Sequence, residues 1–125
     1  MIHYNYKERK ETLFIYIVAT GMTPISFDEA YTKAWRKGMI GTGFHYFIDS
    51  SGIVSEDRPI EAVADERYEN NDKAIYILVE AESVDTDTFE QEEALTDLIS
   101  DLTTQYPIEE VIRETGWTAD SILKK

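Results

Sequence analysis

Continuous apolar runs along the chain predict its strands. Residues 12–19 (TLFIYIVA) and 74–80 (AIYILVE) are rich in β-branched and aromatic side chains, which indicates two buried strands. Residues 44–48 (FHYFI), a turn at 49–52 and residues 53–55 together predict a β-hairpin.

Two further segments carry apolar residues at helical spacing behind a capping signal. Ser26 stands three residues before Glu29, and Thr88 three residues before Gln91, which predicts a helix start at each place. Pro107 is expected to end the second helix. The predicted apolar faces are Phe27, Ala30, Tyr31, Ala34 and Trp35 in the first helix, and Leu95, Leu98, Ile99, Leu102 and Tyr106 in the second.

The order of these elements predicts an α/β fold. A strand, a helix, a hairpin, a strand, a helix and a last short strand at 111–112 are expected to form a mixed central β-sheet flanked by helices. Residues 56–73 are polar and are expected to be irregular, and residues 120–125 are expected to form a short helix or a frayed tail. At 125 residues the chain has the length of a single domain, 1–125, with its core at about 10–115.

Charge is distributed unevenly along the chain, whose formal net charge is −13. Residues 1–48 carry six Lys or Arg against four Asp or Glu, whereas residues 74–112 carry eleven Asp or Glu and no Lys or Arg. Such an acidic block repels nucleic acid and favours a protein partner with a basic surface, and a face that only maintains solubility is the alternative. The carboxylates between Glu80 and Asp101 would carry such an interface. The partner-binding candidates expected to face solvent on the second helix are Glu90, Glu93, Asp97 and Asp101.

The sequence lacks cysteine, which excludes disulfides, thiolate nucleophiles and cysteine-containing metal sites. No apolar run approaches the roughly 20 residues that span a bilayer. Residues 1–10 are polar and contain no signal-peptide core, so a cytoplasmic protein without a membrane partner is expected.

Few residues could carry ordinary catalytic chemistry. The chain has two histidines, His3 and His45, and a lone histidine on a strand is more often structural than a metal ligand. Gly41-Thr42-Gly43 is too short for a phosphate loop and precedes a strand. Acidic pairs are expected by chance in so acidic a chain, so they are weak evidence for acid–base catalysis.

Residues 35–54 (WRKGMIGTGFHYFIDSSGIV) resemble the core of the zinc-dependent N-acetylmuramoyl-L-alanine amidases. That family includes the small phage lysozymes of amidase type and the peptidoglycan-recognition proteins. Its helix ending in Trp or His leads through a Gly-rich turn into a strand written roughly Gly-Tyr-His-Phe-Ile-Ile, followed by a turn and Gly-Thr-Val. The resemblance covers about residues 10–115, in matched order, through the segments 14–20, 58–63, 71–79 and 89–107.

The sequence departs from the family at the positions that hold zinc. The resemblance places Tyr16 at the first zinc histidine and Glu114, with Arg113 as the alternative, at the second. The third ligand, a Cys or Asp, has no counterpart in residues 115–125.

Other positions of the family's active site differ as well. Glu66 stands at a histidine of a His-Ala pair, Phe44 at a tyrosine that assists catalysis in some members, and Tyr76 at a glycine. His45 matches a family residue that is not among the metal ligands. Five of these positions are expected to surround one former cleft, with Tyr16 and Tyr76 largely buried; they are Tyr16, Phe44, Glu66, Tyr76 and Glu114.

These departures predict that the amidase chemistry is absent. Zinc hydrolysis needs about three ligands and an open position for water. Tyr16 is a poor ligand because the pKa of a phenol is about 10, and one carboxylate alone does not hold zinc. The sequence therefore predicts an inactive site with no metal and no cofactor.

The leading prediction is a catalytically inactive binding or regulatory protein, encoded by a phage or a mobile element, that acts on a protein partner. The resemblance implies a precedent, because some phage amidases bind and inhibit an RNA polymerase. One alternative is a peptidoglycan or muropeptide binder that keeps the groove without cutting. Another is a hydrolase rebuilt around Glu66, Glu114 and His45.

Overall fold

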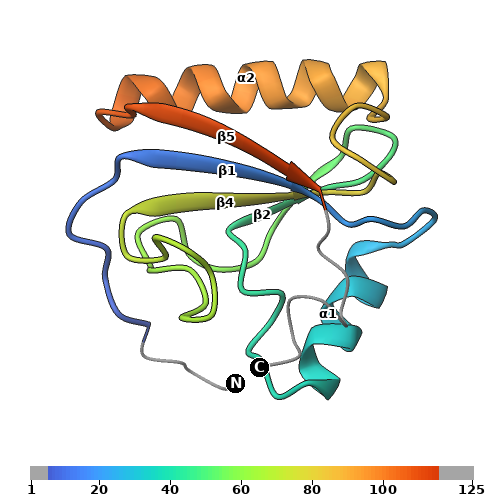
Figure 1. Cartoon of the computed structure of the whole chain (residues 1–125), viewed down its shortest axis with the longest axis horizontal. Coiled ribbons are helices and arrows are strands. Elements are labelled where there is room, and N and C mark those ends of the chain that lie inside the picture. The colour runs from blue at the N-terminus through green and yellow to red at the C-terminus, as the bar shows by residue number, and fades with distance from the viewer. Residues whose placement is uncertain (1–5, 116–125) are drawn as a thin grey trace.

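Five strands form one mixed sheet in the computed structural model, which describes residues 6–115 (Figure 1). The strands are β1 (Phe14–Ala19), β2 (Tyr46–Ile48), β3 (Val54–Glu56), β4 (Ala74–Val79) and β5 (Glu110–Thr115). They lie in the order β3-β2-β4-β1-β5. All neighbouring pairs are parallel except the β2–β3 hairpin. The predicted mixed sheet and hairpin are thus confirmed.

Helices cover both faces of this sheet, so β1 and β4 are apolar along their whole length. Helix α2 (Phe89–Gln105) lies along one face, and α1 (Phe27–Arg36) lies on the other side, near one end of the strands (Figure 1). Alternate residues of β1 therefore enter different cores. Ile15 and Ile17 pack with Leu95 of α2, whereas Tyr16 packs in the opposite core. The short last strand expected at 111–112 is β5, which extends β1 on its free edge.

Both helices begin at the predicted capping boxes. The Ser26 hydroxyl accepts from the Glu29 amide at 3.1 Å, and the Glu29 carboxylate accepts from the Ser26 amide at 3.0 Å. Thr88 and Gln91 make the same reciprocal pair at 3.1 and 2.8 Å. These bonds satisfy amides that the first helical turn leaves without partners.

Helix α1 buries less of its apolar face than its spacing predicts. Ala30 and Ala34 are fully buried, whereas Tyr31 is 37% and Trp35 57% exposed. The two alanines are small and let the helix approach the core closely. Tyr31 and Trp35 each follow an alanine by one residue, so their side chains point away from the most buried side of the helix. Trp35 is therefore a surface side chain and not a core residue.

The irregular segment predicted at 56–73 consists mainly of turns and packs below the sheet on the side of α1 (Figure 1). Its Ala62 forms a β-bridge with Glu8 of the N-terminal segment. No helix within residues 6–115 is long and apolar enough to cross a membrane. The tail expected at 120–125 lies outside the described residues.

Candidate functional site

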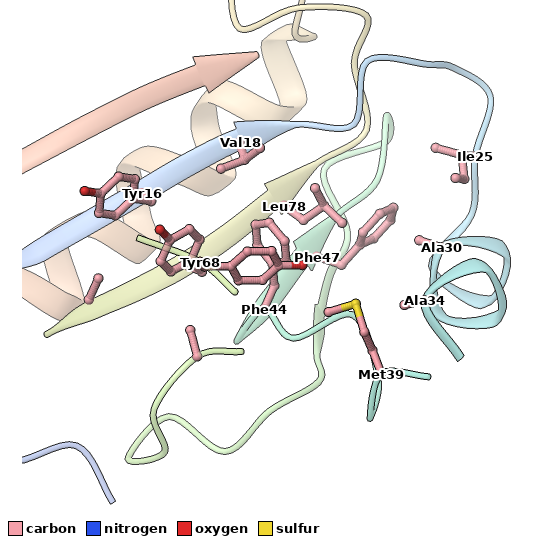
Figure 2. Packing of buried hydrophobic residues seen from close by; sticks show 13 residues of the cluster. Tyr16, Val18, Ile25, Ala30, Ala34, Met39, Phe44, Phe47, Tyr68 and Leu78 are labelled. Carbon is pink, nitrogen blue, oxygen red and sulfur yellow. The ribbon is translucent and has the colours of Figure 1, made fainter. Parts of the chain in front are cut away.

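Four aromatic side chains pack together on the sheet face opposite α2, and we call them the aromatic cluster (Figure 2). Tyr16 of β1 and Tyr76 of β4 are direct neighbours in the parallel register, and their rings stack with centroids 4.7 Å apart and planes 1° apart. Phe44 meets the Tyr76 ring edge-on at 5.4 Å. Tyr68 lies 4.9 Å from Phe44 and 5.1 Å from Tyr76. Three members of the cluster, Tyr16, Phe44 and Tyr76, are positions that the resemblance assigns to the former cleft.

The local sequence makes this packing possible through Gly43, directly before Phe44. Its φ of +81° is costly for other residues. A Cβ there would lie 2.6 Å from the Asp65 Cβ and 3.0 Å from the Tyr68 ring. The glycine thus allows the 65–68 segment to close over the sheet. Tyr68 belongs to a polar segment without periodicity, so no sequence pattern identified it as a member of the cluster.

Every hydroxyl of the aromatic cluster has a hydrogen-bond partner. The Tyr16 hydroxyl accepts from the Asn70 amide at 2.9 Å. The Tyr76 hydroxyl donates to the carbonyl of Glu69, and the Tyr68 hydroxyl donates to the carbonyl of Thr42 at 2.7 Å. A buried cluster with its polar atoms satisfied is a stable arrangement.

The phenols of Tyr16 and Tyr76 are held in the protonated form. Burial raises the pKa of Tyr16, and the carboxylates of Glu69 and Glu114 raise it further. Burial also raises the pKa of Tyr76, with Tyr16 and Glu114 adding to the effect. A phenol binds zinc as a phenolate, so these shifts make the pair poorer metal ligands than free tyrosine.

The two residues at the family's zinc positions lie on the same side of the sheet. Glu114 is paired with Val18, which is two residues from Tyr16 on β1, so both side chains belong to the same face. Glu114 is exposed, whereas Tyr16 is 3% exposed. Arg113, the alternative at this position, lies on the other face and contacts α2.

Glu66 is expected from the sequence to lie around the former cleft, but it is not a member of the aromatic cluster. The Asp65 carboxylate accepts from the Arg67 amide at 2.9 Å, and this tight turn leaves Glu66 exposed at its corner. Among the described residues, Glu66 contributes instead to the lining of a neighbouring open pocket.

His45 is buried and uses both of its ring nitrogens. The Tyr76 amide donates to Nδ1 at 3.0 Å, so Nε2 carries the proton and donates to the Ala62 carbonyl at 2.7 Å. Arg9 donates to the same carbonyl at 2.8 Å. Burial, together with the charges of Arg9 and Arg58, lowers the pKa of His45 to about 4. Both ring nitrogens of His45 are therefore engaged in hydrogen bonds inside the protein.

Within residues 6–115, no three His, Asp or Glu side chains converge as metal ligands. His3 lies outside the described part of the chain. The arrangement around Tyr16 is therefore an aromatic packing site, and its chemistry is apolar contact and neutral hydrogen bonding.

The acidic block is only partly available for binding. Four carboxylates of α2 are exposed, as expected: Glu90, Glu93, Asp97 and Asp101. The expectation that Glu80 contributes to an exposed interface is wrong. Its side chain is 6% exposed and accepts three hydrogen bonds inside the protein.

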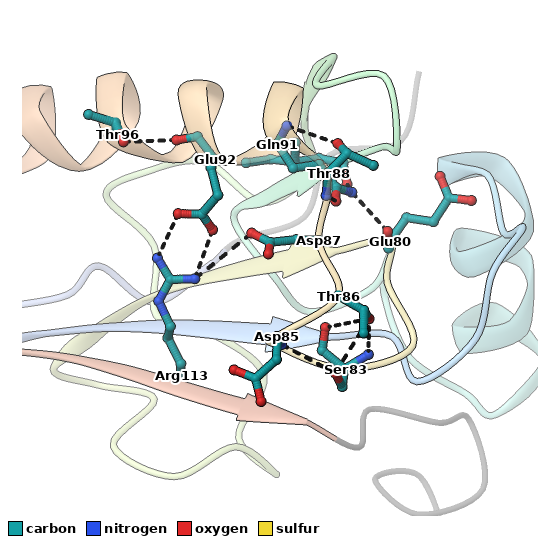
Figure 3. Close-up of polar contacts among 11 residues, drawn as sticks. Glu80, Ser83, Asp85, Thr86, Asp87, Thr88, Gln91, Glu92, Thr96 and Arg113 are labelled. Atoms are coloured by element: carbon teal, nitrogen blue, oxygen red, sulfur yellow. Dashed lines mark hydrogen bonds and ion pairs between the residues drawn. The ribbon is translucent and has the colours of Figure 1, made fainter.

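A basic residue from outside the acidic block pairs with two of its carboxylates. Figure 3 shows Arg113 reaching from β5 to Glu92 and Asp87. Its Nη1 lies 3.0 Å from a carboxylate oxygen of Glu92 and 4.0 Å from one of Asp87. The parallel pairing of β5 with β1 brings Arg113 to α2, which spacing along the chain could not reveal. The free acidic surface is thus the outer side of α2.

Neither a protein-family model nor a curated protein sequence matches the chain. Solved structures, in contrast, match the chain. The N-acetylmuramoyl-L-alanine amidase LysC from Clostridium intestinale matches with a TM-score of 0.77 and 21% identity, over 90% of this chain and 78% of that one. PGRP-Hd from Alvinella pompejana matches with a TM-score of 0.70 and 14% identity, over 90% and 79%.

A mutant of Drosophila PGRP-LB in complex with tracheal cytotoxin matches with a TM-score of 0.70 and 14% identity, over 87% of this chain and 73% of that one. These similarities cover 87% to 90% of this chain. The chain has the fold of the N-acetylmuramoyl-L-alanine amidases and the peptidoglycan recognition proteins.

Proposed function

We propose that this chain uses an amidase-like fold for binding and not for hydrolysis, and that it binds a protein partner with a basic surface. The observation that carries the first part is the stacked Tyr16–Tyr76 pair, which stands where the resemblance places a zinc histidine. Hydrolysis in this fold family needs zinc ligands around an open position for water. A packed aromatic cluster with protonated phenols supplies neither.

The second part of the proposal is supported by the outer side of α2. Its four exposed carboxylates, Glu90, Glu93, Asp97 and Asp101, lie along one helix without a basic residue among them. Exposed like charges on this scale attract a basic surface over a Debye length of about 8 Å at physiological ionic strength. We expect the partner's lysines and arginines to meet this side of the helix.

The absence of hydrolysis is tested by metal content and activity together. The purified protein is expected to contain far less than one equivalent of zinc, to melt at the same temperature with added zinc or a chelator, and to leave peptidoglycan uncut. A site at a thousandfold excess of zinc over Kd would stabilise the fold by about 4 kcal/mol, which a thermal melt detects easily. An active zinc amidase of the same fold is the positive control. One tightly bound zinc, or cleavage of the amide bond, contradicts the proposal.

The acidic surface is tested by charge reversal. The double variant Glu93→Lys/Asp97→Lys is expected to weaken partner binding about tenfold or more, and to flatten its dependence on salt. Both residues are exposed, so the stability of the fold should change by less than about 0.5 kcal/mol.

The matched control is Glu11→Lys/Asp72→Lys, which makes the same change in net charge at exposed positions outside α2. Binding partners cross-linked to the wild-type protein are purified and titrated against both variants. Equal weakening by the two variants would mean that only net charge matters, and the assignment of α2 would be wrong.

A muropeptide is the second candidate ligand. It is favoured by the structural similarity to a recognition protein in complex with tracheal cytotoxin. Calorimetric titration with a purified muropeptide separates the two functions. Saturable heat that survives the charge reversal on α2 would replace the protein-partner proposal with muropeptide binding.

A further inference from the structure

An open pocket of about 460 Å³ lies beside the aromatic cluster. Met39 and Ala64 form the shared wall, because they belong to the core around the cluster and also line the pocket. The remaining lining brings together parts of the chain that are distant in sequence: residues 6–7, 38–40, 58, 63–67 and 71. The volume suits a small molecule, since ligand pockets typically measure about 300–1,000 Å³.

The pocket concentrates positive charge on a strongly acidic protein. Lys7, Arg58 and Arg67 line it, although the whole chain has only 12 Lys or Arg for 25 Asp or Glu. Two carboxylates line it as well. The Asp65 carboxylate accepts a hydrogen bond from the Arg67 amide at 2.9 Å and lies 3.9 Å from the Arg67 Nε. Glu66 lies exposed at the turn.

Arg58 is the least expected member of this lining because it is 8% exposed. Its Nη1 and Nη2 donate to the carbonyls of Val63 and Ile40, each at 3.2 Å. The guanidinium lies 5.0 Å from the centre of the Tyr6 ring, and Nε has no hydrogen-bond partner within residues 6–115.

Burial raises the pKa of the neighbouring Asp57 carboxyl and the charge of Arg58 partly offsets this rise, but the hydrogen bonds of Asp57 run to Thr42. Asp57 accepts from the amide and the hydroxyl of Thr42, both at 2.6 Å. The hydrogen bonds of Arg58 therefore run to neutral carbonyl oxygens. A buried guanidinium is normally compensated by a carboxylate or a phosphate, so Arg58 holds a site ready for an anion.

From this geometry we infer that the pocket binds a small molecule through an oxyanion, either a carboxylate or a phosphate monoester. Arg58 supplies fixed positive charge at the wall, and Lys7 and Arg67 supply charge-assisted donors nearer to solvent. The inference is independent of the partner proposed for α2, because none of the lining residues belongs to that helix.

The experiment measures binding of inorganic phosphate and of acetate by calorimetry, at an ionic strength held constant with chloride. The wild-type protein is expected to bind one of the two anions at a single site. The variant Lys7→Ala/Arg67→Ala should weaken that binding at least tenfold. The matched control Lys10→Ala/Lys73→Ala removes the same charge at exposed positions outside the pocket and should leave the affinity within twofold.

The two anions distinguish the source of the oxyanion. Binding of phosphate alone assigns a phosphorylated ligand, and binding of acetate alone assigns a carboxylate. The conservative variant Arg58→Lys keeps the charge but loses the fork of donors, and it should weaken binding while the chain stays folded by circular dichroism. No saturable binding of either anion to the wild-type protein overturns the inference. Equal effects of the pocket and control variants overturn it as well.

Discussion

Replacing Glu80 with alanine is expected to lower the free energy of unfolding by about 3–5 kcal/mol, a large part of the stability of a small domain. One carboxylate oxygen of Glu80 accepts from the Ile25 amide at 2.8 Å and the Thr23 hydroxyl at 3.1 Å. The other accepts from the Ser50 amide at 2.9 Å. Each donor left without a partner costs about 1–3 kcal/mol. The side chain thus ties the end of β4 to the loop before α1 and to the hairpin turn.

Urea denaturation of three variants checks this expectation. Glu82→Ala is the control, because Glu82 carries the same charge two residues later and is exposed, so its loss should cost less than about 0.5 kcal/mol. Glu80→Gln keeps one acceptor oxygen and should fall between the other two variants. If Glu80→Ala were as stable as Glu82→Ala, Glu80 would belong to the solvent-facing acidic surface after all.

The fold was predictable because its signals are local or periodic. The apolar runs of β1 and β4, which are buried on both faces, and the capping boxes at Ser26 and Thr88 each depend on residues close together in the chain. The exposure of Trp35 was not predictable, because it depends on how closely α1 approaches the sheet through Ala30 and Ala34.

The candidate site was predictable only where it lies on strands. Tyr16 and Tyr76 meet because β1 and β4 are paired in register, and a strand pattern determines which face each side chain occupies. Glu66 and Tyr68 lie in turns, where no period indicates a direction. The roles of Glu80 and Arg113 depend on partners 21 or more residues away. Composition alone therefore described Glu80 as part of the acidic block and gave no sign that Arg113 contacts that block.

His45 is expected to make the protein sensitive to acid. Its pKa in the folded state is about 4, whereas an unfolded histidine has a pKa of about 6.5. The folded state therefore binds fewer protons between these values. The contribution of neutral His45 is complete above about pH 6.5 and is lost as the pH falls toward 4. A difference of about 2.5 pKa units corresponds to about 3 kcal/mol.

Other groups contribute to the pH dependence with the opposite sign. Burial raises the pKa of Asp87 to about 6 and also raises that of Asp57, so both carboxyl groups gain protons on folding and favour the folded state as the pH falls. The effect of His45 must therefore be measured as a difference between the wild-type protein and a variant that lacks this histidine, because both proteins share the contributions of Asp57 and Asp87.

The variant His45→Asn isolates that difference, since an asparagine oxygen can still accept from the Tyr76 amide but the side chain does not titrate. At pH 7 the wild-type protein should be the more stable of the two in urea. Its advantage should shrink by about 3 kcal/mol between pH 7 and pH 4, because only the wild-type protein must then keep an imidazole neutral. Proton NMR of the wild-type ring should show the same resistance, with titration near pH 4. A stability difference that stays constant over this range, or a ring that titrates near pH 6.5, would mean that His45 is reached by solvent and is free to act in a site.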